Sequence, residues 1–117
     1  MNYTILIYET GDDFAKRDDP AQQAEYWAAW PPYMQALREA GIYVAGAVLQ
    51  PPDTATTIRF RDSDRLVQDG PFADTKEQLG GFYTIDVPDL DTALEWAARC
   101  PSMPGRAYEV RPNLRRS

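Results

Sequence analysis

The residues with the clearest capacity for chemistry lie between positions 69 and 83, where charged side chains stand among glycines and a proline. Asp69 and Glu77 carry carboxylates that could transfer a proton, and Lys76 carries an amine that could bind an anion. Pro71 restricts the backbone around these groups, and Gly80-Gly81 suggests either an unusual φ or a close approach to the backbone. The segment therefore predicts either a tightly specified turn or the rim of a binding site.

Each of these residues also has a purely structural interpretation. Asp69 is expected to accept backbone N–H groups of the turn that begins at Gly70, which is favoured over a role as a base or ligand anchor. Phe72 is expected to be a core residue rather than a surface on which a ligand stacks. Lys76 is favoured as a solvated surface residue over a ligand-binding one. For Glu77, an ion pair or plain exposure is favoured over a general base with a raised pKa.

Two further groups of residues could complete a site. Arg59 and Arg61 share one face of a predicted strand and could hold an anionic ligand through charge-assisted hydrogen bonds. Salt bridges to a neighbouring strand or subunit explain these arginines equally well. Aromatic residues of a predicted helix could form a wall of a cavity, but their helical spacing favours packing in the core. These aromatic residues are Tyr26, Trp27, Trp30 and Tyr33.

The composition argues against several kinds of site. The 117 residues include no histidine and a single cysteine, Cys100, so the commonest general base and the usual transition-metal ligands are lacking. We therefore predict no metal and no cofactor, and we expect Cys100 to be a small buried residue. The net charge of −6 argues against nucleic acid or an anionic membrane as a partner. The cysteine usage and the lack of a long apolar run favour a cytoplasmic protein.

Periodicity predicts one α+β domain that covers residues 1–117. Pro31 and Pro32 interrupt the first helix and predict a kink or a restart there, and Pro71 is expected to open a helical turn over residues 72–76. Residues 9–20 are predicted to form a polar connection and a candidate lid. The expected strands cover residues 3–8, 42–49, 55–61, 66–68, 82–87 and 107–111, and the expected helices cover residues 21–40 and 90–99.

The predicted order is strand, helix, a series of strands, helix, strand, which is typical of the ferredoxin-like split βαβ sandwich. We expect an antiparallel sheet with both helices on one face. The other face would still carry apolar side chains, so the sequence predicts that the protein forms a homodimer.

The run Asp69-Gly70-Pro71-Phe72, extended through residues 75–82 and 85–88, resembles the signature of the YCII-related family and, more narrowly, of its DGPF-type branch. Residues 5–8, 45–51 and 93–97 support the resemblance, which covers nearly the whole chain. It implies a ferredoxin-like fold that pairs into a dimeric α+β barrel with a cleft near the motif. Enzyme-like members of the broader family act on small ring-derived acids through a His–Asp pair. This chain has no histidine, so the pair has no counterpart here.

Three functions remain open. The first is a small homodimeric protein that binds a small anionic organic ligand near Arg59, Asp69, Phe72 and Lys76. The second is a cofactor-free lyase or isomerase in which Asp69 or Glu77 moves a proton. The third is a structural or regulatory dimer that has no ligand.

Overall fold

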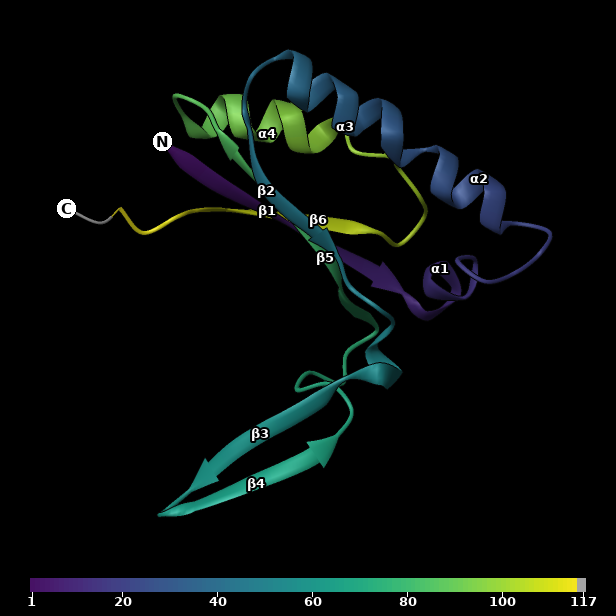
Figure 1. Ribbon diagram of the computed structural model, residues 1–117, viewed down its shortest axis with the longest axis vertical. Coiled ribbons are helices and arrows are strands. Elements are labelled where there is room, and N and C mark those ends of the chain that lie inside the picture. The colour runs from purple at the N-terminus through teal and green to yellow at the C-terminus, as the bar shows by residue number, and fades with distance from the viewer. Residues whose placement is uncertain (116–117) are drawn as a thin grey trace.

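The computed structural model describes residues 1–115, and a four-stranded antiparallel sheet forms the body of the protein (Figure 1). The strands lie in the order β2-β5-β1-β6, so the two central strands are the first and the fifth along the chain. Together with the helices, this sheet is the α+β arrangement that the sequence predicts and is consistent with a ferredoxin-like fold. The strands are β1 (Asn2–Thr10), β2 (Tyr43–Val48), β5 (Glu77–Asp86) and β6 (Ala107–Pro112).

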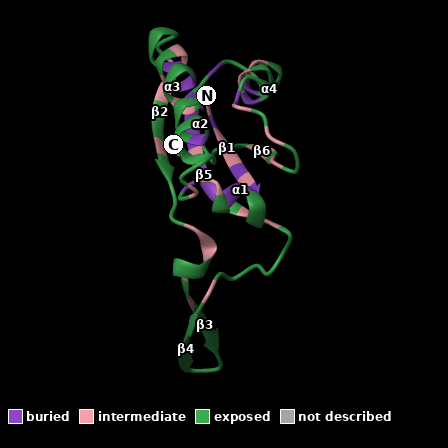
Figure 2. Ribbon diagram, turned by 90° about the vertical axis from the view of Figure 1, so that its right-hand side faces the viewer, coloured by how far each residue is buried: buried purple, intermediate pink, exposed green. Residues whose placement is uncertain are grey.

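One face of the sheet forms the core. Along β1, every second residue is buried, beginning with Tyr3, Ile5 and Ile7. The helices α3 (Trp30–Glu39) and α4 (Leu90–Ala98) pack on this face, and both have buried stretches (Figure 2). They contribute Leu37 and Ala93, which are both fully buried. Both long helices therefore cover the same face of the sheet, as the sequence predicts.

The first predicted helix is divided into two. The helix α2 (Gln23–Ala28) is followed by its capping residue, Ala29. The helix α3 begins at the next residue, with Pro31 in its first turn. Proline has no N–H to donate, so the restart that the sequence predicts here is confirmed. The aromatic residues that are expected in the core lie there only in part, because Tyr33 is buried while Trp27 is 39% exposed.

The open face of the sheet is the side opposite the helices. Leu6 of β1 and Phe82 of β5 pair directly across the two central strands, and both are only half-buried. Tyr8, two positions further along β1, pairs with Leu79 after the register shift that follows Ile7. The alternation of side chains along β1, together with one extra residue in β5 at the register shift, places these four residues on the open face.

A β-hairpin projects from the body (Figure 1). It consists of β3 (Thr56–Arg61) and β4 (Asp64–Asp69), and the short 3₁₀ helix η1 (Pro52–Thr54) precedes it. Ile58 and Phe60 lie on one face of the hairpin and are 52% and 79% exposed. The radius of gyration is 16.1 Å, whereas a compact chain of this length would have about 13 Å. The hairpin makes the chain more extended than an ordinary globular domain.

The segment after β4 differs from its prediction. Residues 70–76 form no helical turn. Gly70 has a φ of 102°, in the region that favours glycine, and its N–H donates to the Ala55 carbonyl at 2.7 Å. This conformation closes the base of the hairpin and directs Pro71 and Phe72 outward. Phe72 is 72% exposed, so the expectation that it belongs to the core is wrong in this chain.

Candidate functional site

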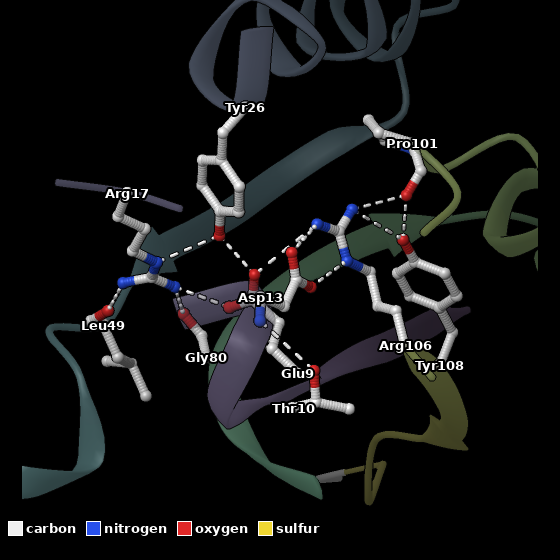
Figure 3. A network of polar contacts seen from close by, with 10 residues as sticks. All are labelled: Glu9, Thr10, Asp13, Arg17, Tyr26, Leu49, Gly80, Pro101, Arg106 and Tyr108. Carbon is white, nitrogen blue, oxygen red and sulfur yellow. Dashed lines mark hydrogen bonds and ion pairs between the residues drawn. The ribbon is translucent and has the colours of Figure 1, made fainter. Parts of the chain in front are cut away.

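Four charged side chains are buried together where β1 ends and the short helix α1 (Gly11–Ala15) begins (Figure 3). Glu9 and Asp13 are each 1% exposed, and the side chains of Arg17 and Arg106 are also buried. We call this group the charged network. The prediction that residues 9–20 form a polar connection is therefore wrong for Glu9, Asp13 and Arg17, which lie inside the protein, whereas Asp12 and Asp18 are exposed.

Arg17 and Tyr26 bind the Glu9 carboxylate. Arg17 Nη2 lies 2.6 Å from Glu9 Oε2, and the Tyr26 hydroxyl donates to Glu9 Oε1. Arg17 Nε in turn donates to the Tyr26 hydroxyl oxygen at 3.0 Å. The remaining donors of Arg17 bind the carbonyl oxygens of Leu49 and Gly80. Burial, and then the hydrogen bond to Glu9, raise the pKa of Tyr26, so it remains a neutral phenol.

Arg106 binds the second carboxylate. Its Nε and Nη2 donate to the two oxygens of Asp13 at 2.8 and 2.9 Å, a bidentate pair. Its Nη1 donates to the Pro101 carbonyl at 2.6 Å, and the Tyr108 hydroxyl donates to the same carbonyl. Burial alone would lower the pKa of Arg106, but the bonds to Asp13 and Tyr108 raise it. The negative charges of the two carboxylates are thus balanced by the positive charges of the two guanidinium groups within the charged network.

The local backbone explains how these groups meet. The register between β1 and β5 shifts after Ile7, and Gly80 is the extra residue at that bulge. A Cβ on Gly80 would overlap the Glu9 carboxylate, so the close backbone approach that the sequence predicts at Gly80 is confirmed. Thr10 caps α1 by accepting the Asp13 N–H at 3.2 Å. The buried alternation of β1 continues to Glu9, and this pattern is the sequence signal for its burial.

A pocket of about 560 Å³ lies beside the Asp69-Gly70-Pro71-Phe72 run, and we call it the motif pocket. Its walls come from η1, the base of the hairpin, the segment after β4 and the open face of the sheet. Burial, and then the neighbouring Glu109 carboxylate, raise the pKa of Tyr8 in this wall, so its hydroxyl remains a hydrogen-bond donor near neutral pH. The lining includes Tyr8, Pro51, Thr57, Phe72, Glu77 and Leu79.

The structure brings some of the predicted site residues together. Phe72 and Glu77 both line the motif pocket, and Glu77 is half-buried at the start of β5. The Arg59 guanidinium carbon lies 4.9 Å from the centre of the Phe72 ring, a cation–π distance. The exposed Asp69 and Lys76 lie near this pocket in sequence but outside its lining.

The side chain of Thr57, rather than the Asp69 carboxylate that the sequence predicts, closes the turn at Gly70. The Thr57 hydroxyl donates to the Gly70 carbonyl at 2.7 Å, across the base of the hairpin. The Thr75 hydroxyl donates to the Glu77 carbonyl at 2.6 Å and fixes the end of the same segment. Hydroxyl groups and backbone atoms therefore shape the motif pocket.

A second pocket, of about 460 Å³, lies on the other side of the charged network between α2 and the loop at residues 101–106. We call it the network pocket. Tyr26 and Arg106 contribute to its floor, and Lys16, Glu25 and Met103 also line it. The sequence patterns did not indicate this pocket, because its two walls are 72 or more positions apart in the chain and neither carries a recognisable motif.

Residues 1–115 contain no group of three or more histidine, cysteine, aspartate or glutamate side chains that could hold a metal ion. In the same range, no helix has the length and apolar character needed to cross a membrane. Cys100 is 4% exposed, as the sequence predicts. Burial raises the pKa of its thiol to about 11.

Comparison with known proteins gives two matches over nearly the full length. Residues 1–115 match the YCII-related domain. A protein of Rhizobium meliloti (strain 1021), described as uncharacterized, is 38% identical over 117 residues, which cover 96% of this chain and 91% of the relative. With the α+β fold and the antiparallel sheet described above, these matches show that the chain belongs to the YCII-related family.

Proposed function

We propose that this protein is a cytoplasmic homodimer of the DGPF-type branch and that it binds a small anionic organic ligand in the motif pocket. The observation that carries the proposal is the composition of the pocket wall. Tyr8 and Leu79 line the motif pocket, and both belong to the open face of the sheet. A second copy packed against that face would enclose the pocket and turn it into a cleft between two subunits.

The chemistry of the lining favours a ligand with an apolar body. Pro51, Phe72 and Leu79 offer apolar contacts, while Tyr8 and Thr57 offer hydroxyl groups. The volume lies within the range of about 300–1,000 Å³ that is typical of small-molecule sites.

A positive charge is available at one edge of the motif pocket. Arg59 packs over the Phe72 ring and can orient an anionic group by charge-assisted hydrogen bonds. Lys76 is exposed in the segment that ends the pocket wall and adds a second cation. Glu77 carries a negative charge within the lining, so the anionic group of the ligand would lie toward Arg59 and away from Glu77.

Glu77 also favours a second candidate function, that of a cofactor-free lyase or isomerase. It is a half-buried carboxylate in the lining of the motif pocket, where a bound ligand would lie beside it and could give up a proton to it. Asp69 lies outside that lining. Of the two carboxylates with a predicted catalytic role, Glu77 is therefore the one that we propose for this reaction.

The proposal is tested by native mass spectrometry of gently purified wild-type protein and an Arg59→Gln variant, with Arg65→Gln as the control. Arg65 lies on the same hairpin but pairs with Phe60, on the face opposite Arg59. We expect the wild type and Arg65→Gln to be dimers that carry the same extra mass, and Arg59→Gln to be a dimer with less of it. Equal occupancy in all three proteins would contradict the role of Arg59, and dimers without extra mass would favour a structural or regulatory role.

A further inference from the structure

The network pocket has a rigid frame. Arg106 binds Asp13, next to one wall, through two hydrogen bonds, and it binds the Pro101 carbonyl of the opposite wall through a third. The Arg106 guanidinium carbon also lies 5.6 Å from the centre of the Tyr26 ring, which ties α2 to the same group. One buried guanidinium therefore connects both walls of the pocket and fixes their separation.

Burying these charged groups is energetically unfavourable if they serve only to stabilise the fold. Burying four charges carries a desolvation penalty, and apolar residues of similar volume often stabilise a protein equally well or better. A binding role would explain the burial of the charged network. Walls that are held in a fixed geometry reduce the entropy lost when a ligand binds.

The charged groups that line the network pocket differ in whether they already have a partner. The Arg106 charge is already matched by Asp13. Lys16 and Glu25 line the pocket with opposite charges, and among residues 1–115 neither takes part in an ion pair. A ligand with a single charge would match one of these two groups and leave the other partly desolvated without a partner, which is unfavourable. A ligand that carries both an ammonium and a carboxylate group would match both.

The rest of the lining indicates what kind of side chain the ligand carries besides its two charged groups. Met103, Ala29 and the buried Tyr26 present apolar surface, and methionine adapts readily to aromatic groups. We propose that the network pocket binds a free α-amino acid with a large apolar side chain, with its carboxylate on Lys16 and its ammonium group on Glu25. This site is separate from the motif pocket and does not depend on the function proposed there.

The probe for the test is L-phenylalanine, titrated into the full chain while backbone amide chemical shifts are recorded by NMR. Two analogues isolate the charges, since N-acetyl-L-phenylalanine lacks the ammonium group and L-phenylalaninamide lacks the carboxylate. We expect saturable shifts at residues 16, 25 and 101–106 at millimolar concentrations of L-phenylalanine. Each analogue should bind about tenfold or more weakly, the loss expected for one charge-assisted hydrogen bond.

Variants assign each charge to its partner. Lys16→Gln should weaken L-phenylalanine to the level of the amide, and Glu25→Gln should weaken it to the level of the acetylated analogue. Arg38→Gln is the matched control, because it also removes one exposed positive charge and lies on α3, outside both the network pocket and the motif pocket. An absence of saturable shifts around the pocket, equal binding of all three probes, or an equal loss in Arg38→Gln would each overturn the proposal.

Discussion

At the scale of single residues, Gly80 controls whether the charged network can form. Its Cα lies against the Glu9 carboxylate, so the methyl group of Gly80→Ala would displace Glu9 from Arg17. We expect this substitution to reduce the free energy of unfolding by about 3–5 kcal/mol, the range for breaking a buried ion pair. Urea denaturation measures the loss. Gly11→Ala is the control, because no atom lies within 4 Å of its added methyl group and its stability should change by at most about 1 kcal/mol.

The bidentate pair of Asp13 and Arg106 leads to a separate prediction. Asp13→Asn leaves the buried Arg106 charge without its main partner and should cost about 3–5 kcal/mol of unfolding free energy. The double variant Asp13→Leu/Arg106→Met removes both charges. It should therefore lose clearly less stability than the sum of Asp13→Leu and Arg106→Met measured singly. Additive losses in a thermal or urea series would show that the two side chains do not act as a pair.

Cys100 and Tyr108 predict how stability depends on alkaline pH. Burial raises the pKa of the Cys100 thiol from 9.0 to about 11 and that of the Tyr108 phenol from 10.0 to about 12. Both groups must stay neutral in the folded protein, so their contribution is complete below pH 9 and is lost as the pH rises toward 12. We expect the urea midpoint to fall over this range, and to fall less steeply in Cys100→Ala. A midpoint that is constant across this range would contradict the prediction.

The sequence could predict part of the candidate site at this scale. The close approach at Gly80 and the burial of Cys100 follow from residue type and position. The charged network could not be predicted, because Asp13 and Arg106 are 93 positions apart and only the folded chain brings them together. Glu9 is the exception, since it continues the buried alternation of β1. The apolar side chain of Phe72 predicts a place in the core, but the turn at Gly70 leaves the ring exposed.

At the scale of elements, the β3–β4 hairpin should be the least protected part of the sheet structure. A two-stranded hairpin without further packing is marginally stable in water. Local opening of the hairpin would leave the core of β1 and β5 intact, so its amide protons should exchange in hydrogen-exchange measurements well before those of Ile5 and Ile85. Equal protection of Ile58 and Ile5 would contradict this order and would show that the hairpin is packed against another surface.

Elements with a local cause were predictable, and those that depend on distant contacts were not. The restart between α2 and α3 follows from Pro31 and Pro32, whose effect on the helix is local. The helical turn predicted after Pro71 does not form, because the hydrogen bond between Gly70 and Ala55 fixes the backbone at the base of the hairpin. The position of the hairpin outside the main sheet could not be read from the periodicity of its two strands.

At the scale of the whole molecule, the open face of the sheet should hold two copies together. Phe82 lies near the centre of that face and pairs with Leu6. Phe82→Glu would place a charge in the proposed interface, so we expect it to convert the dimer to a folded monomer, as measured by light scattering with circular dichroism. Leu90→Glu is the control, because Leu90 is an exposed apolar residue at the start of α4 on the helix side. A dimer that survives Phe82→Glu would place the interface elsewhere.

The central claim is that two copies enclose a ligand in the motif pocket. The measurement that tests it most directly is the native mass spectrum of the wild-type protein, purified gently from its own or a related host. We predict a dimer that carries additional mass corresponding to a small organic molecule. A clean monomer at micromolar concentration would contradict the claim, because the open face and the motif pocket would then have no partner subunit to cover them.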